Sequence, residues 1–260
     1  MILEEIAEKT HQRVAAQKKQ IPLENLKLQA EAMDCGRFGC FKKALSEPGM
    51  SFICEVKKAS PSKGVIAAEF PYLEIARQYD EAGASAISIL TEPYYFQGSN
   101  GYLQQIRHIT ELPLLRKDFT VDAYMIYEAK VIGADAVLLI CSLLEKEILR
   151  QYLQLCRQLG LEALVEAHDE KEIAMALAAG AEIIGVNNRN LKDFTVDIGN
   201  SMRLRQMVPE HVAFVAESGM KTRADIAQLE EAHVNGGLIG ETLMRSADKK
   251  RMLQQLKGLV

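Results

Sequence analysis

Residues 52–64 read FICEVKKASPSKG, an apolar strand that runs into a loop of Ser, Pro, Lys and Gly. Successive side chains of a strand point to opposite faces, so Ile53, Glu55 and Lys57 share one face, and the other face is apolar. The charged face carries a carboxylate and an ammonium where a core strand would carry Val or Leu. Buried charge is costly unless it is paired or used. Glu55 and Lys57 therefore either neutralise each other in a packed core or line a site, and this strand alone favours neither.

From Gly49 onward, short apolar segments alternate with amphipathic ones. We predict strands over residues 51–58, 84–91, 112–119, 134–141, 161–167, 181–187, 211–217 and 235–240, each followed by a helix, over 70–82, 101–109, 122–132, 146–159, 169–179, 198–207, 222–232 and 243–256. Glycines that would stop helices precede four of the strands: Gly83, Gly133, Gly160 and Gly180. Units of about 25 residues in this number predict an α/β protein, a closed (β/α)8 or TIM barrel. An open doubly wound sheet is the alternative, but no G-x-G-x-x-G turn follows the first strand.

Residues 1–49 are predicted to form an N-terminal helical extension of the barrel, which occupies 50–260, within a single domain over 1–260. The pattern indicates a helix over 3–20, a short helix over 22–31 and a further helical piece over 41–45. Pro48-Gly49 ends the segment. It could cap either end of the barrel, and periodicity does not say which.

Composition excludes several classes of protein. The chain has 31 basic and 35 acidic residues, a formal net charge of -4, which argues against a general nucleic-acid binder. No apolar run reaches the ~20 residues needed to cross a bilayer, and residues 1–19 lack the apolar centre of a secretory signal. We therefore expect a cytoplasmic protein without nucleic-acid or membrane partners.

The cysteines and histidines predict no metal site. The five cysteines are expected to be free thiols, with Cys54, Cys141 and Cys156 in the core. Cys35 and Cys40 are the only close pair, and neither a second pair nor a nearby His completes a zinc set. The histidines lack metal-ligand spacing and are interpreted as surface or capping residues; His168, which closely follows Glu166, is the exception to watch.

Polar side chains stand at the carboxyl ends of five predicted strands, each after an apolar run: Glu55 and Lys57, Lys117, Glu166, Asn187 and Arg189, and Glu217 and Ser218. In a (β/α)8 barrel these ends converge on the active site. The loops after the seventh and eighth strands, around Ser218-Gly219 and residues 236–242, are rich in small residues and precede helices. Backbone N–H groups and helix N-termini there favour an anion, so we predict a phosphate site.

Six of these segments resemble the strand-end motifs of the indole-3-glycerol phosphate synthase family of tryptophan biosynthesis, in the same order along the chain. They are EVKKASPSKG (55–64), LRKDF (115–119), VEAH (165–168), GVNNRNL (185–191), AESG (216–219) and LIGETLM (238–244). The resemblance extends over essentially the whole chain, including the extension. It implies a carbon–carbon lyase that converts 1-(2-carboxyphenylamino)-1-deoxyribulose 5-phosphate to indole-3-glycerol phosphate, with release of carbon dioxide and water.

By this resemblance, Lys117 is the general acid at the substrate's ketone oxygen, and Glu166 assists dehydration. Lys57 holds the substrate and is a second candidate for the acid, and Glu55 orients Lys57. We expect burial and the nearby Lys57 to push the pKa of Lys117 down. The resemblance also implies contacts with substrate hydroxyl or amine groups (Asn187, Glu217), the carboxylate (Ser60, Arg189), the aromatic ring (Phe96, Phe119, Leu138) and, mainly through backbone groups, the phosphate (Ser218, Gly219, Gly240, Glu241).

The same resemblance implies no metal or organic cofactor and a small phosphorylated substrate. It leaves open a monomer or a weak homo-oligomer and contacts with other enzymes of the pathway. Two features fit less well: the polar, Gly-rich start of the eighth strand, residues 233–237, and the absence of Trp from the extension. The rival interpretations are a sugar-phosphate isomerase or Schiff-base aldolase on the same barrel, and a non-catalytic barrel that serves as a phosphate-ligand sensor or a scaffold.

Overall fold

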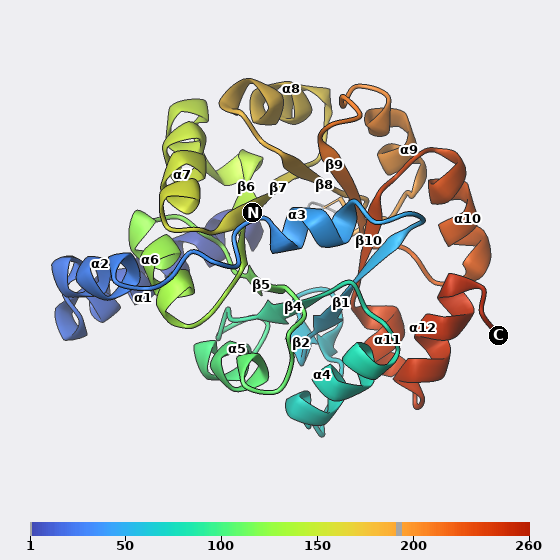
Figure 1. Ribbon diagram of the computed structural model, residues 1–260, viewed down its shortest axis with the longest axis horizontal. Coiled ribbons are helices and arrows are strands. Elements are labelled where there is room, and N and C mark those ends of the chain that lie inside the picture. Colours follow the sequence, from blue (N-terminus) through green and yellow to red (C-terminus); the bar gives the residue numbers. More distant parts are fainter. Residues whose placement is uncertain (1, 191–193) are drawn as a thin grey trace.

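The computed structural model describes residues 2–190 and 194–260, and its centre is a closed barrel of eight parallel strands (Figure 1). In chain order the barrel strands are β1 (Ser51–Val56), β4 (Ala86–Leu90), β5 (Leu114–Lys117), β6 (Ala136–Ile140), β7 (Glu162–Ala167), β8 (Ile183–Asn187), β9 (Ala213–Glu217) and β10 (Gly236–Ile239). Neighbours in sequence pair around the ring, and β10 closes it against β1, with Ser51 opposite Gly236. The predicted barrel is confirmed.

Helices surround the barrel (Figure 1). They are α4 (Tyr72–Glu81), α5 (Asn100–Arg107), α6 (Ala123–Val131), α7 (Lys146–Gln158), α8 (Glu170–Ala179), α9 (Gly199–Arg205), α10 (Arg223–Glu231), α11 (Glu241–Arg245) and α12 (Lys249–Lys257), with a 3-10 turn η1 (Cys141–Leu143) after β6. The four predicted helix-stop glycines all adopt positive φ, between 68° and 91°. Only glycine adopts that conformation without strain, which explains why the helices end there.

Two predicted elements were wrong in detail. The helix expected over 243–256 is divided into α11 and α12, because Ser246 is extended and Asp248 begins a new helix by accepting a hydrogen bond from the backbone N of Arg251 at 2.8 Å. The loop expected over 59–69 contains a small antiparallel hairpin of β2 (Ala59–Ser60) and β3 (Gly64–Val65). Leu191, at the end of the fourth motif, GVNNRNL, lies outside the described residues.

The barrel strands divide their side chains as the alternation predicts. Ile53 of β1 belongs to a cluster inside the barrel that includes Leu115, Leu164 and Val215. Phe52 and its alternate neighbours on β1 belong to a second cluster that includes the inner faces of the helices. The three cysteines predicted to be in the core are buried there.

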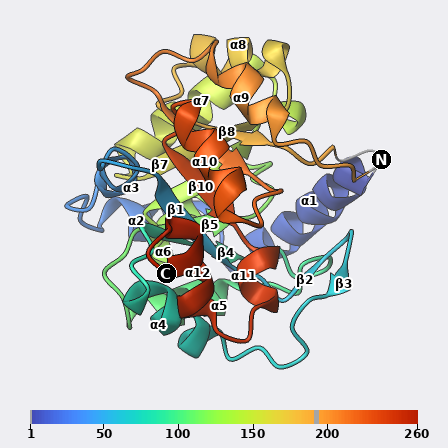
Figure 2. The ribbon, with the colours of Figure 1, turned by 90° about the vertical axis from the view of Figure 1, so that its right-hand side faces the viewer.

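The extension covers both ends of the barrel, which settles the question that periodicity left open. Figure 2 shows α1 (Ile2–Gln20) and the β2–β3 hairpin at one end, and α3 (Cys40–Leu45) at the other; α2 (Leu23–Glu31) packs on α6. At the amino ends of the strands, α3 buries Phe41 and Leu45 against the inner cluster. Helix α3 thus forms a plug in the base of the barrel. Glu162 holds the plug in place by accepting hydrogen bonds from the backbone N of Phe41 at 2.7 Å and of Lys42 at 2.9 Å.

The polar start of β10 also belongs to this base. A Cβ on Gly236 would lie 3.1 Å from Leu45 Cδ2, so the small residue makes room for the plug. Asn235 Oδ1 accepts a hydrogen bond from the backbone N of Phe214 at 2.8 Å. The unusual composition of residues 233–237 is therefore explained by packing at the end opposite to the predicted phosphate site. No described helix has both the length and the apolar character needed to span a membrane.

Candidate active site

The carboxyl ends of the strands surround a cavity of about 550 Å³. Every residue predicted for the site lines it, from all eight strands or the loops that follow them: Glu55, Lys57, Ser60, Phe96, Lys117, Phe119, Leu138, Glu166, Asn187, Arg189, Glu217, Ser218, Gly219, Gly240 and Glu241. Positions scattered over the chain thus meet around one hollow, as expected of strand ends in a closed barrel.

The ammonium of Lys117 lies between two carboxylates in the depth of this cavity. Its Nζ is 3.2 Å from Glu166 Oε2 and 3.3 Å from Glu217 Oε2. The side chains of the two glutamates are 4% and 3% exposed. Strands β5, β7 and β9 supply these groups, and their inward positions bring them together although they are far apart in sequence. Asn187 of β8 donates a hydrogen bond to Glu166 Oε1 at 3.2 Å.

The predicted direction of the Lys117 pKa was wrong. Burial does lower this pKa, but the carboxylates of Glu217, Glu166 and Glu55 raise it by more, and the net pKa lies above the ordinary value for lysine. The expected contribution of Lys57 is weak because that ammonium is paired with Glu55. Lys117 is therefore a charged ammonium in the cavity.

The two carboxylates that flank Lys117 are shifted in opposite directions. Burial raises the pKa of Glu166, but Lys117, His168 and the amide of Asn187 lower it by more, so Glu166 is ionised at neutral pH. Burial, opposed by Lys117 and assisted by the charge of Glu166, raises the pKa of Glu217 to about 7. Neighbouring acids whose environments separate their pKa values are suited to different proton-transfer roles.

Glu55 and Lys57 both pair with each other and line the cavity, so each of the two alternatives for β1 is partly right. Lys57 Nζ donates to Glu55 Oε1 in a contact with 16% and 5% side-chain exposure, respectively. Gly240 makes room for this pair, because a Cβ there would lie 2.2 Å from Glu55 Oε1 and 2.7 Å from Lys57 Nζ. Any larger residue would displace the pair.

The predicted phosphate corner lies where β8, β9 and β10 end. Ser218 and Gly219 have positive φ, 67° and 94°, which turns the chain sharply beneath the cavity. Ser218 Oγ donates to Asn187 Oδ1 at 3.0 Å. The carboxylate of Glu241 gathers three cations in this corner: Arg245 Nε at 3.1 Å, Arg189 Nη2 at 3.8 Å and Lys63 Nζ at 3.9 Å. Lys63 and Arg245 were not predicted as site residues, although both lie within or beside quoted motifs.

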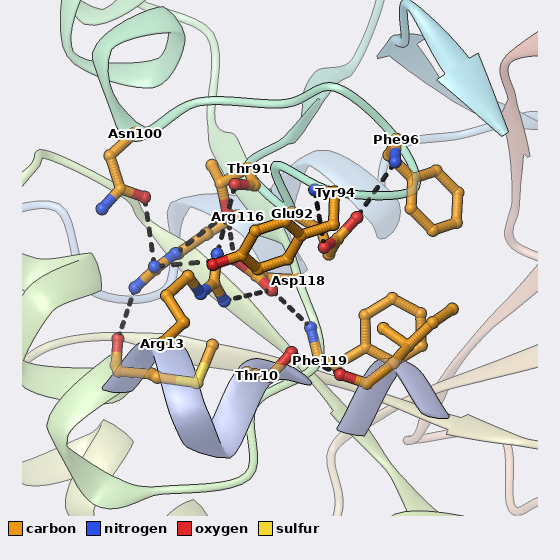
Figure 3. Close-up of polar contacts among 12 residues, drawn as sticks. Thr10, Arg13, Thr91, Glu92, Tyr94, Phe96, Asn100, Arg116, Asp118 and Phe119 are labelled. Atoms are coloured by element: carbon orange, nitrogen blue, oxygen red, sulfur yellow. Dashed lines mark hydrogen bonds and ion pairs between the residues drawn. The ribbon is translucent and has the colours of Figure 1, made fainter. Parts of the chain in front are cut away.

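An aromatic wall closes another side of the cavity. The rings of Phe96 and Phe119 are tilted by 40° with centroids 6.0 Å apart. Glu92 shapes the loop that carries Phe96 by accepting hydrogen bonds from the backbone N of Tyr94 at 2.9 Å and of Phe96 at 3.0 Å (Figure 3). It also accepts one from the backbone N of Tyr95 at 2.7 Å. This buried carboxylate is the second residue after β4, but nothing in its spacing indicated such a role.

Helix α1 completes the cavity with apolar side chains, Ile2, Leu3 and Ile6. An ion pair ties the helix to the site: Arg13 Nη2 lies 2.8 Å from Oδ1 of Asp118, the residue after Lys117 (Figure 3). The sequence did not predict this contact, since the partners are 105 positions apart. His168, which its position closely after Glu166 sets apart from the other histidines, does lie beside that carboxylate, with its Nε2 3.4 Å from Glu166 Oε1. Among the residues that the structure describes, no cluster of His, Cys, Asp and Glu could hold a metal ion.

Comparison with known proteins agrees with the motifs. Residues 3–256 match the family model described as indole-3-glycerol phosphate synthase. A protein of that name from Endomicrobium trichonymphae is 54% identical over 257 residues, which cover 99% of this chain and 100% of the relative. Another, from Ruminiclostridium cellulolyticum, is 51% identical over 99% of both chains.

Solved structures with much lower sequence identity share the fold. A 3-hexulose-6-phosphate synthase matches with a TM-score of 0.64 at 15% identity, over 81% of this chain and 100% of its own. A thiamine phosphate pyrophosphorylase from Pyrococcus furiosus matches with a TM-score of 0.61 at 16% identity, over 81% and 94%. These likenesses concern the barrel alone, because fold does not determine chemistry.

Proposed function

The chain belongs to the indole-3-glycerol phosphate synthase family, and on that premise we propose how its residues divide the chemistry. The reaction converts 1-(2-carboxyphenylamino)-1-deoxyribulose 5-phosphate to indole-3-glycerol phosphate, carbon dioxide and water. The ring carbon that bears the carboxylate attacks the ketone carbon, and the ketone oxygen must gain a proton. After carbon dioxide leaves, a hydroxyl departs and a proton is removed. The site must therefore supply an acid and a base in fixed positions.

Lys117 gives its proton to the ketone oxygen during ring closure. Its place between Glu166 and Glu217 is the observation that carries this assignment, because the two carboxylates keep the ammonium charged and fixed in the cavity. A developing alkoxide is a stronger base than a lysine amine, so a raised pKa does not prevent the transfer. It does oppose a Schiff-base mechanism, which requires the neutral amine as a nucleophile.

Glu166 is the base of the dehydration step, a role supported by its lowered pKa. Lys57, oriented by Glu55, holds the substrate beside Lys117 and is the second candidate for the acid. Asn187 and Glu217 bind hydroxyl or amine groups. Arg189 and Ser60 bind the carboxylate of the substrate. The aromatic ring of the substrate packs against Phe96, Phe119 and Leu138. The backbone around Ser218, Gly219, Gly240 and Glu241 binds the phosphate, with Lys63 and Arg245 adding positive charge nearby.

We also propose that residues 1–260 act as one unit. Helix α1 lines the cavity and α3 closes the barrel base, so the extension contributes to both ends. The cavity is formed within a single chain, which supports a protein that works as a monomer or a weak homo-oligomer.

The assignment of Lys117 is tested by Lys117→Met, with Lys146→Met on the exposed start of α7 as the matched control. Indole fluorescence would follow product formation from the carboxyphenylamino-deoxyribulose phosphate. Loss of the acid should lower kcat by about 10²–10⁴-fold, and the control should retain the original rate. A Lys117→Met protein with near-normal kcat would show that another group supplies the proton.

A further inference from the structure

Glu166 and Glu217 differ in surroundings although they share one ammonium. Both carboxylates lie about equally far from Lys117 Nζ, at 3.2 and 3.3 Å, and both are almost fully buried. The second oxygen of Glu166 faces Asn187 Nδ2 at 3.2 Å and His168 Nε2 at 3.4 Å. The second oxygen of Glu217 has no hydrogen-bond partner among the described residues. Of these two carboxylates, Glu166 alone therefore has a second cationic group within ion-pair distance among the residues that the structure describes.

His168 is held firmly behind Glu166. Its Nδ1 lies 3.1 Å from Glu172 Oε2 at the start of α8, and its backbone N donates to the same oxygen at 2.8 Å. Its carbonyl accepts a hydrogen bond from Asn200 Nδ2 of α9 at 3.1 Å. His168 is not among the residues that line the cavity. His168 Nε2 therefore lies within ion-pair distance of the carboxylate, without a hydrogen bond to it, and the imidazole does not occupy the space for substrate.

This arrangement bears on a difficulty in the order of the two chemical steps. Once Lys117 has given its proton to the ketone oxygen, its amine is neutral and no longer stabilises the neighbouring carboxylate. A buried carboxylate without a cation takes up a proton, because desolvation disfavours the charged form. Glu166 would then be protonated just before the dehydration step, in which it must accept a proton.

We propose that His168 is a positioning residue that keeps Glu166 ionised after Lys117 has given up its proton. This inference rests on the proposed roles of Lys117 and Glu166. In the imidazolium form, His168 faces Glu166 on one side and Glu172 on the other, so its charge is balanced by a carboxylate outside the reaction. Lys117 can then give its proton to the substrate without Glu166 becoming protonated.

The charges around His168 favour this form. Glu166 faces it from β7, Glu172 from α8 and, farther away, Glu217 from β9. The thiol of Cys141 in η1 lies 3.7 Å from the carbonyl of Glu172, and Asn200 of α9 is neutral. Burial lowers the pKa of His168, but Glu172, Glu166 and Glu217 raise it by more, so it lies above the ordinary value. The imidazolium therefore persists to a higher pH than in a free histidine.

The direct test titrates Glu166 when Lys117 carries no charge. Lys117→Met mimics the neutral lysine that remains after proton transfer. The titration of the Glu166 carboxyl is followed by ¹³C NMR of protein labelled at glutamate Cδ. Its signal is assigned by its absence from the spectrum of Glu166→Gln. We expect Glu166 to remain ionised at pH 7 in Lys117→Met. In Lys117→Met/His168→Gln, which keeps an amide donor near the Nε2 position without a charge, its pKa should rise by about 1–3 units. Equal pKa values in the two proteins would overturn the proposal. No turnover is needed, so this result is independent of whether Lys117 is the acid.

Turnover provides a second readout. In His168→Gln with Lys117 intact, the acid limb of the kcat–pH profile should move up by about 1 unit or more. KM should stay within about twofold, since His168 does not line the cavity. Glu172→Gln should cause a smaller shift in the same direction, because it removes one of the charges that keep His168 protonated. The exposed His211→Gln is the control. An unchanged profile, or a loss of kcat that is equal at every pH, would refute the charge-based role.

Discussion

Replacing Arg13 by Met should destabilise the protein far more than removal of an ordinary ion pair. Arg13 Nη2 lies 2.8 Å from Asp118 Oδ1, and the two side chains are only 12% and 0% exposed. Asp118 also accepts hydrogen bonds from Thr91 Oγ1 at 2.6 Å and from the backbone N of Phe119 at 2.8 Å (Figure 3). The substitution leaves this buried carboxylate with Arg116, at 3.7 Å, as its remaining cationic partner.

The magnitude follows from burial. Breaking a buried pair by removing one partner costs about 3–5 kcal/mol, and the remaining Arg116 places the expected loss near the lower end, about 3 kcal/mol. At about 2–4 °C per kcal/mol for a chain of this size, the melting temperature should fall by about 6–12 °C. KM should rise as well, because Arg13 anchors the helix whose Ile2, Leu3 and Ile6 line the cavity.

Thermal unfolding followed by circular dichroism tests the number, and Lys18→Met is the matched control on the same helix. Lys18 pairs with Asp122 at 2.6 Å, but the side chains are 36% and 29% exposed. Such a pair contributes about 0–1 kcal/mol. Arg13→Met/Asp118→Asn should recover part of the loss, since no unpaired charge remains. If Arg13→Met melted at the same temperature as Lys18→Met, the assignment of a buried, anchoring ion pair would fail.

Two further outcomes follow from the site. Gly185→Ala should lower kcat/KM by about tenfold or more, because its Cβ would lie 2.2 Å from Glu217 Oε1 and small displacements of site groups are costly; Gly180→Ala, with nothing within 4 Å of its Cβ, should strain only the backbone and leave kcat/KM unchanged. Burial raises the pKa of Glu217 to about 7, above its value in the unfolded chain. The stability that this group contributes is therefore present at low pH and lost as pH rises through about 7. The melting temperature of Glu217→Gln should gain on that of the original protein between about pH 5 and pH 7, and a constant difference across this range would contradict the shift.

Most of the fold was predictable because it follows from regular, local patterns in the sequence. The alternation on β1 separated Ile53, Glu55 and Lys57 from the side packed under helices, and positive φ at glycines such as Gly83 and Gly180 ended the helices where expected. Parallel strands in a closed barrel have all their carboxyl ends at one rim, so polar residues placed there in the sequence had to meet. For that reason the whole predicted residue set lines the cavity.

Contacts between side chains that are distant in the sequence could not be predicted from the sequence. Nothing local indicates that Arg13 should meet Asp118, or that Glu92 should fold the loop that carries Phe96. The break between α11 and α12 depends on Asp248, whose capping role competes with a pattern that is helical on either side. The sequence could not show which ends of the barrel the extension covers, because an amphipathic pattern indicates that one face of a helix is buried but not which surface buries it.

The error over Lys117 shows how charge must be counted in such a site. From the motifs, Lys57 was the charge expected nearest to Lys117, and it favoured a lowered pKa of Lys117. In the fold, the ammonium of Lys57 is paired with Glu55, and Glu166 of β7 and Glu217 of β9 lie beside Lys117 instead. The end of the cavity around Lys117 is thus rich in carboxylates, whereas Lys63, Arg189 and Arg245 gather around Glu241 at the other corner. A substrate with a phosphate and a reactive ketone meets opposite fields at its two ends. In the binding mode that we propose, the phosphate is repelled from the glutamates and attracted to the side of this corner that carries Lys63 and Arg245, and the ketone then lies beside Lys117 before any chemistry begins.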